Sequence, residues 1–199
     1  MFTRLVPGSR RAFLSLSEEE ILALAISSEE EDARIYLSYA KNLKEAYPSS
    51  AKVFEDMAEV EQTHKNMLIQ MFRSRFGENI PLIRREHVQG FYARKPDWLM
   101  RNLPLDKIRE QTEAMERQAA RFYREAAKRV SDASTRQLLG DLALAEDGHE
   151  DIARMLSEKH VPEETRSEED LSARRQFILT YVQPGLAGLM DGSVSTLAP

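Results

Sequence analysis

The sequence contains an internal repeat of two motifs, and each motif carries acidic side chains at helical spacing. The first motif, Glu-x3-Ala-Arg-apolar-Tyr-x3-Ala-Lys, begins at Glu29 and returns 87 residues later at Glu116. The second, Asp-apolar-Ala-x2-Glu-x2-His, begins at Asp56 and returns 85 residues later at Asp141. The motifs occur in the same order each time. A pair of helices in the first half of the chain therefore recurs in the second half.

Long stretches without Gly or Pro are rich in Ala, Leu, Glu, Arg and Lys, which favours helix. Ser17 with Glu20 three residues later forms a capping box, which predicts the start of the first helix. Pro48 predicts its end and Gly77 predicts the end of the second. We expect helices over residues 17–46, 49–76, 104–130 and 131–159 (or 134–159), and a fifth that begins near residue 167.

Residues 77–104 connect the second and third predicted helices and are long for a bundle connection. A link of this length is needed when those two helices lie parallel on opposite sides of a bundle. The prediction is an all-α, four-helix bundle with a long crossover between its second and third helices. The same link could carry helices into a partner chain, so a domain-swapped homodimer remains open.

The acidic residues of the repeat lie within apolar stripes, because offsets of 3, 4, 7 and 11 residues share one helix face. Buried neighbouring carboxylates repel one another, whereas two divalent cations would neutralise four of them. Glu-x2-His on each of two helices, with one Glu from each of the other two, is the ligand set of bundle di-metal sites. The predicted ligands are Glu29, Glu61, His64, Glu116, Glu146 and His149.

Oxygen-rich ligands with some imidazole suit iron, with manganese as an alternative. A single Glu-x2-His is usually a solvated pair, and it is the repetition inside apolar stripes that makes the signal specific. Tyr36 and Tyr123 follow Glu29 and Glu116 by two turns, and each hydroxyl is expected to hydrogen-bond a ligand carboxylate across the bundle.

Glu113 lies one turn before the predicted ligand Glu116, and Asp32 lies one turn after the predicted ligand Glu29. Each has three interpretations: an extra carboxylate ligand, a residue on the route into the site, or a surface group.

Composition excludes several classes of function. The formal net charge is -5 and the charges are mixed along the chain, which argues against nucleic acid as a partner. Cysteine is absent, which excludes disulfides and thiolate metal sites and fits a reducing compartment.

Over residues 17–160 the chain resembles the rubrerythrin branch of the ferritin-like superfamily. The resemblance rests on Glu29 with Tyr36, Glu61 with His64, and their repeat counterparts at Glu116, Tyr123, Glu146 and His149. It implies a ferritin-like fold with two Fe ions, since rubrerythrins reduce peroxide and ferritins oxidise ferrous iron at such a centre. Two features depart from rubrerythrins. The chain lacks the cysteines of a rubredoxin-like domain, and Ala119 stands where an additional ligand Glu is expected, unless Glu113 replaces it.

Residues 177–199 contain no Lys or Arg and resemble the opening of the first membrane helix in the vacuolar iron transporter family. Fusions of a rubrerythrin-like domain to such a transporter are the membrane-bound ferritins, which export iron in bacteria. This resemblance implies a di-iron domain at 1–165 and a linker helix with the start of a membrane segment at 166–199. Arg174 and Arg175 would keep the bundle on the cytoplasmic face of the inner membrane. The alternative is a fifth amphipathic helix packed on the bundle.

The leading functional hypothesis is a domain that binds and oxidises Fe(II), with dioxygen or hydrogen peroxide as oxidant, in the service of iron homeostasis and export. One alternative is a peroxide-reducing oxidoreductase of the rubrerythrin type. Another is a non-enzymatic, metal-sensing dimerisation module.

Overall fold

The structure is a computed structural model that describes residues 10–89 and 103–158, with side chains through residue 149. The described chain is all-α apart from one tiny strand pair. Its four helices are α1 (Glu18–Leu43), α2 (Pro48–Phe76), α3 (Leu105–Ala127) and α4 (Ala133–Glu158). The predicted fifth helix and the segment at 166–199 lie outside the described residues. Within the described part, no helix is both long enough and apolar enough to span a membrane.

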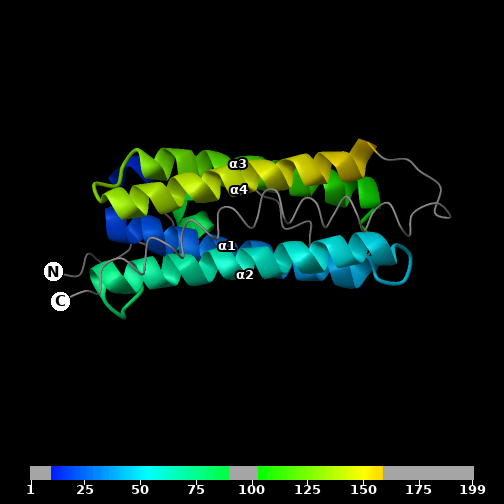
Figure 1. Cartoon of the computed structure of the whole chain (residues 1–199), viewed down its shortest axis with the longest axis horizontal. Helices are drawn as coiled ribbons and strands as arrows, with labels where there is room; N and C mark the ends of the chain where they lie inside the picture. Colours follow the sequence, from blue (N-terminus) through cyan, green and yellow to red (C-terminus); the bar gives the residue numbers. More distant parts are fainter. Residues whose placement is uncertain (1–9, 90–102, 159–199) are drawn as a thin grey trace, which may run out of the picture.

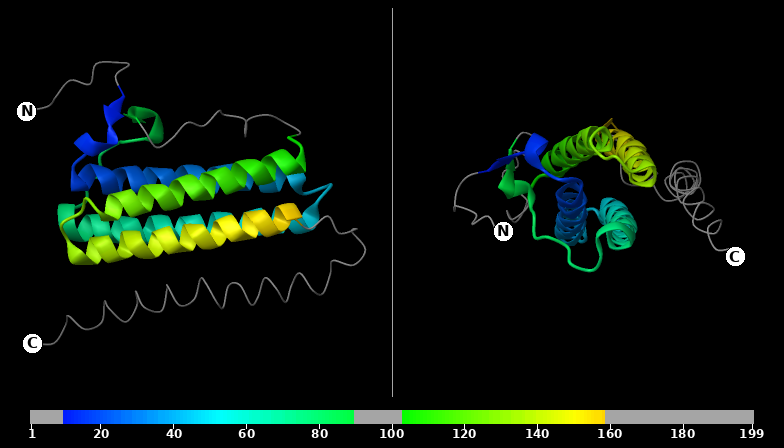
Figure 2. Two further views of the ribbon diagram at one scale, coloured as in Figure 1. Left: turned by 90° about the horizontal axis from the view of Figure 1, so that it is seen from above. Right: turned by 90° about the vertical axis from the view of Figure 1, so that its left-hand side faces the viewer.

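The four helices form two antiparallel hairpins that pack face to face, α1 with α2 and α3 with α4 (Figures 1 and 2). The end-on view in Figure 2 shows α1 against α3 and α2 against α4. In Figure 1, α1 and α4 run in one direction while α2 and α3 run in the other. Because α2 and α3 are parallel, the link between them must return along the bundle, so the predicted long crossover is confirmed. A domain swap stays a prediction.

The helix ends follow local capping chemistry. The predicted capping box is present at the start of α1, where the Glu20 amide donates to Ser17 Oγ (3.2 Å) and the Ser17 amide donates to Glu20 Oε2 (2.9 Å). Pro48 is the first residue of α2, a position where its missing N–H costs nothing. Gly77 follows α2 with φ +85°, a conformation that glycine adopts without strain.

Helix α4 begins at Ala133, between the two starts predicted at 131 and 134. Asp132 caps it: its Oδ2 accepts hydrogen bonds from the amide and the hydroxyl of Thr135, both at 2.8 Å. Two predicted helices end earlier than expected, since α1 stops at Leu43 and α3 at Ala127.

The hydrophobic core is divided into two clusters. One lies at the α1 N-terminal end of the bundle and includes Leu22, Phe72 and Leu139, all fully buried. The other lies toward the opposite end and includes Tyr39 and Phe54. In α1, α2 and α3 the predicted ligand residues fall between the stretches that form the two clusters. The polar residues therefore form a layer across the middle of the bundle.

The segment after α2 lies along α1. Ser27 Oγ donates to the Ile83 carbonyl (2.6 Å), and a short 3-10 helix, η2 (Arg85–His87), follows. Strand β2 (Val88–Gln89) then pairs in parallel with β1 (Arg11–Ala12), and Val88 is buried. A second 3-10 turn, η1 (Phe13–Ser15), leads from β1 into α1. These contacts fix the first part of the crossover to the bundle.

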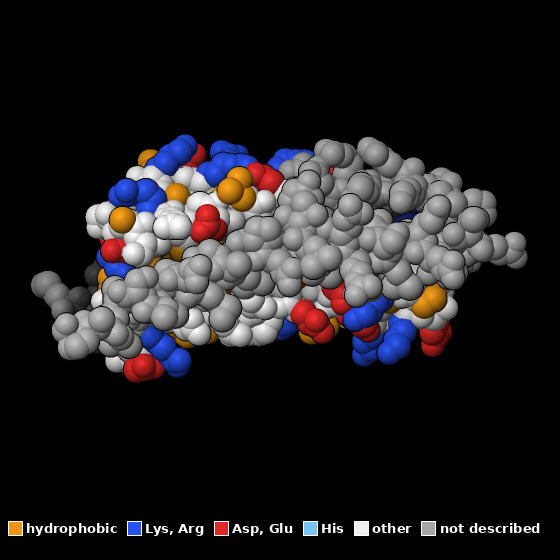
Figure 3. Space-filling model, viewed as in Figure 1, with side chains coloured by type: hydrophobic (Ala, Val, Ile, Leu, Met, Phe, Trp, Pro, Cys, Tyr) orange, Lys and Arg blue, Asp and Glu red, His pale blue; other side chains and the backbone are white. Residues whose placement is uncertain are grey.

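Charged side chains of both signs are mixed over the described parts of the face drawn in Figure 3, with scattered hydrophobic ones. Charged side chains also join elements at the ends of the bundle. Glu18 at the start of α1 accepts hydrogen bonds from Arg75 at the end of α2, from Ser131 Oγ (3.1 Å) and from the Asp132 amide (3.5 Å). The hydrogen bond from Arg75 is the main reason that the pKa of Glu18 lies below its usual value.

Glu18→Gln should therefore lower stability in a pH-dependent way. A lowered pKa stabilises the fold above the unfolded-state pKa, and this contribution is lost as the pH falls through the folded-state value. At pH 7 we expect a loss of roughly 1 kcal/mol in the free energy of unfolding, fading below about pH 4. Urea denaturation across this range measures it. Glu19→Gln removes the same charge from the same turn as a control, and equal losses in both variants would contradict the prediction.

Candidate metal centre

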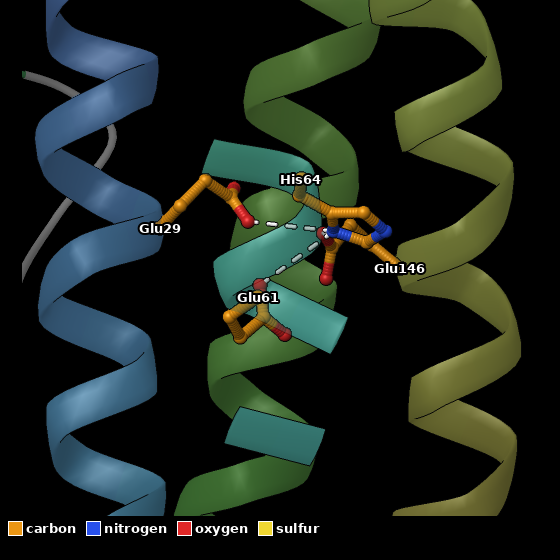
Figure 4. A group of neighbouring side chains, drawn as sticks. All are labelled: Glu29, Glu61, His64 and Glu146. Carbon is orange, nitrogen blue, oxygen red and sulfur yellow. Dashed lines mark ion pairs between the residues drawn. The ribbon is translucent and has the colours of Figure 1, made fainter. Parts of the chain in front are cut away.

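The six predicted ligands converge in the middle of the bundle. Each helix contributes at least one: Glu29 comes from α1, Glu116 from α3, and a Glu-x2-His pair from each of α2 and α4. All six side chains are buried, with exposed fractions between 1% and 5%. Figure 4 shows four of them, from three helices, pointing toward one another: Glu29, Glu61, His64 and Glu146.

The six residues form two overlapping groups. The first group is Glu29, Glu61, His64 and Glu146, and the second is Glu61, Glu116, Glu146 and His149. In each group, one nitrogen or oxygen atom from every residue lies within 4.8 Å of the others. Glu61 and Glu146 belong to both groups. Two carboxylates therefore lie between two adjacent positions, and each position has one further Glu and one His of its own.

The two groups are built alike. His64 Nδ1 lies 3.3 Å from Glu146 Oε1 and 3.4 Å from Glu29 Oε2. In the second group, His149 Nδ1 lies 3.6 Å from Glu61 Oε1, the repeat counterpart of Glu146, and 3.4 Å from Glu116 Oε2. The two imidazole rings are nearly parallel, with their centroids 5.8 Å apart. This symmetry follows from the internal repeat.

Each of the six side chains has one buried nitrogen or oxygen atom that makes no hydrogen bond within the described part of the chain. Leaving such an atom unpaired is costly, so a cluster of six needs an explanation. The atoms are Glu29 Oε2, Glu61 Oε1, His64 Nδ1, Glu116 Oε2, Glu146 Oε1 and His149 Nδ1. Carboxylate oxygen and imidazole nitrogen are ligands that suit iron or manganese. The residues therefore fit a metal centre.

The pKa shifts of the clustered residues reflect the crowding of charge in this layer. Burial, followed by the charges of Glu146 and Glu29, raises the pKa of Glu61 well above its usual value. Burial and the charge of Glu146 likewise raise the pKa of Glu116 to about 8. Burial opposes protonation of His149, but contacts with Glu116 and Glu146 outweigh it and raise its pKa to about 9. Without cations, the crowded carboxylates thus retain protons on themselves and on their neighbours.

Contacts with neighbouring carboxylates also raise the pKa of His64 well above its usual value, although burial acts in the opposite direction. Glu146 behaves differently from the other acids. Burial raises its pKa, but contacts with His149, His64 and Glu116 outweigh burial and hold the pKa well below the usual range. The carboxylate between the two histidines therefore carries the negative charge that both imidazoles face.

The two tyrosines hydrogen-bond across the bundle, as the sequence predicts. The Tyr36 hydroxyl on α1 donates to Glu116 Oε1 on α3, and the Tyr123 hydroxyl on α3 donates to Glu29 Oε1 on α1. Both tyrosines are about 1% exposed. In each of these two glutamates, one oxygen is held by a tyrosine while the other faces a histidine.

Asp32 and Glu113 lie outside both groups. Asp32 is buried, but its carboxylate is paired with Arg85 of η2. Glu113 is partly exposed and pairs with Arg117 one turn along α3. The structure thus places neither with the six clustered residues. The sequence did not single out Arg85, because nothing distinguishes it from its neighbour Arg84 until the chain folds.

Comparison with known proteins agrees with this geometry. A solved structure of a hypothetical protein from Pyrococcus furiosus has a similar fold, with a TM-score of 0.63 and 24% sequence identity. The match covers 73% of this chain and 91% of that one. A search of the curated proteins finds no match. The rubrerythrin family model matches residues 20–157, which is more than half of the chain and includes all six clustered residues. Rubrerythrin-type domains bind iron. The chain therefore belongs to the rubrerythrin family.

Proposed function

We propose that this domain binds two Fe(II) ions at the two overlapping groups and oxidises them. The observation that carries the proposal is the pair of groups that share Glu61 and Glu146, with one buried atom on each residue that makes no hydrogen bond within the described part of the chain. Shared carboxylates suit two ions held side by side better than one. Four carboxylates also balance the charge of two divalent cations, which removes the repulsion that raises the pKa of Glu61.

When bound, a pair of ferrous ions supplies two electrons, which with two protons reduce dioxygen to hydrogen peroxide. The protein holds the ligands for this chemistry. Glu61 and Glu146 would be available to both ions, and His64 and His149 would add neutral donors once they lose their protons. Tyr36 and Tyr123 fix the outer glutamates by holding one oxygen of each, which leaves the other oxygen for metal.

Ala119 favours iron oxidation over efficient peroxide reduction as the main activity. It lies one turn after Glu116, is 6% exposed, and has no side chain that could reach a metal. This is the position of the additional ligand Glu of rubrerythrins. Glu113 does not replace it, because that carboxylate pairs with Arg117 at the surface.

We further propose that the domain serves iron homeostasis and export, through a membrane transporter segment that begins within residues 166–199, on the cytoplasmic face of a bacterial inner membrane.

The proposed activity is tested by anaerobic Fe(II) titration followed by air. We expect about two equivalents of Fe(II) per chain, then near-ultraviolet absorption typical of oxo-bridged ferric pairs as dioxygen is consumed. Adding peroxide in place of air tests the alternative, since a rubrerythrin-type peroxidase would oxidise the ferrous protein faster with peroxide. Two equivalents of bound Fe(II) with no oxidation by either oxidant would contradict oxidase activity and favour the metal-sensing module.

Substituting a shared ligand should affect both metal positions, whereas substituting an unshared ligand should affect one. We expect Glu61→Ala to weaken both Fe(II) binding steps by at least about tenfold, and Glu29→Ala to weaken mainly one. Calorimetric titration without oxygen separates the two steps. Glu59→Ala on the exposed side of α2 is the matched control. Selective loss of a single ion in Glu61→Ala would show that Glu61 is not shared.

Removing a tyrosine hydroxyl beside the centre should alter metal binding without removing a ligand. Tyr36→Phe frees Glu116 from its hydrogen bond, and we expect Fe(II) affinity or the oxidation rate to fall by roughly tenfold. Tyr39→Phe is the control, because Tyr39 is equally buried on α1 but its hydroxyl donates to Gln111 Oε1 at 2.6 Å. Stopped-flow absorption after mixing with dioxygen measures the rate. Equal effects in both variants would indicate a general packing defect.

A further inference from the structure

A fifth buried carboxylate, Asp32, lies next to the metal centre. It follows Glu29 by three residues, which places it about 60° around α1 and about 4.5 Å along the helix axis. It is 5% exposed, so water does not solvate its charge. Because residues three apart share one helix face, a change of side-chain torsion would turn this carboxylate toward Glu29 and the first group.

The internal repeat shows that this acid is not a general requirement of the site. Adding the 87-residue offset that relates Glu29 to Glu116 takes Asp32 to Ala119. The first half of the repeat thus has an acid where the second half has a methyl group. The extra negative charge needs a compensating partner of its own, and the structure supplies one.

That partner is Arg85, whose guanidinium contacts three neighbouring residues of α1. Nη1 donates to Asp32 Oδ1 at 2.7 Å, and Nη2 donates to the second oxygen, so the pairing is bidentate. Nε donates to Ser28 Oγ at 3.1 Å and Nη2 also to the Ser28 carbonyl at 3.3 Å. Glu31 Oε2 lies 3.5 Å from Nη1. Arg85 is itself 5% exposed, so this pair is screened little by solvent.

The backbone that carries Arg85 is also fixed. Before it, the Ile83 carbonyl accepts a hydrogen bond from Ser27 of α1, and after it Val88 is buried in the β1–β2 pair. The guanidinium is therefore held from both sides on the flank of α1 away from Glu29. Its contacts go to Ser28, Glu31 and Asp32, the residues on that flank.

We propose that Arg85 is a positioning residue that holds Asp32 out of the metal centre and so limits the centre to four carboxylates. This inference rests on the proposed di-metal centre and deepens it. Four carboxylates balance two divalent ions, whereas a fifth would leave excess negative charge that stabilises trivalent ions relative to divalent ones. The pair thereby sets which oxidation state the centre holds most tightly.

Cobalt(II), which is not oxidised by air at such oxygen-rich ligands, tests this without relying on activity. We expect Arg85→Met to release Asp32, to bind Co(II) at least about tenfold more tightly, and to show weaker visible absorption per cobalt as the coordination number rises. Arg85→Met with Asp32→Asn should restore the wild-type affinity and spectrum. Arg85→Lys keeps the positive charge beside Asp32 and should also resemble the wild type.

Asp32→Asn alone covers the case in which Arg85→Met fails to fold, as judged by circular dichroism. Its Co(II) spectrum should equal that of the wild type, because Asp32 is not a ligand while Arg85 holds it. A changed spectrum in Asp32→Asn, or an unchanged spectrum and affinity in folded Arg85→Met, would overturn the inference. A wild-type protein that fails to bind two Co(II) ions would instead count against the di-metal centre itself.

Discussion

Mutual repulsion among four buried carboxylates is the constraint on which the rest of the structure depends. Glu29, Glu61, Glu116 and Glu146 each expose at most 2% of their surface, so water cannot screen their charges. Helices that carry such a layer cannot close a continuous apolar core across it, which is why the core is divided into two clusters. Burial and the charges of neighbouring carboxylates raise the pKa of Glu61, as expected for acids crowded in a layer that water does not reach.

The internal repeat makes this layer a joint property of the two hairpins. The first group takes three residues from α1 and α2 but also needs Glu146 of α4, and the second takes three from α3 and α4 but needs Glu61 of α2. The tyrosine hydrogen bonds likewise join α1 to α3. Neither hairpin can therefore form a complete site alone. Because the polar links cross between hairpins, metal binding and hairpin packing stabilise each other.

Much of this could be predicted from the sequence, because helical periodicity and the repeated motifs are local signals. They place Glu61 and His64 on one face of a helix and predict that Tyr36 reaches across the bundle. The pairing of Asp32 with Arg85 could not be predicted in this way. Its spacing from Glu29 is as good as that of Glu61 from His64, and only the placement of a connecting segment 53 residues away decides that it pairs with Arg85. The periodicity of a sequence shows which residues share a helix face, but it does not show where a distant loop packs against that helix.

The Asp32–Arg85 pair also makes one half of the duplicated site chemically different from the other. The repeat makes the six clustered residues nearly symmetric, yet the acid at Asp32 and the methyl group at Ala119 break that symmetry one turn away. The first group therefore lies one helical turn from the charged Asp32–Arg85 pair, whereas the second lies one turn from the apolar side chain of Ala119. The two groups thus share their residue types but differ in the side chains just beyond them, and a duplicated site can diverge at such neighbouring positions while its clustered residues stay the same.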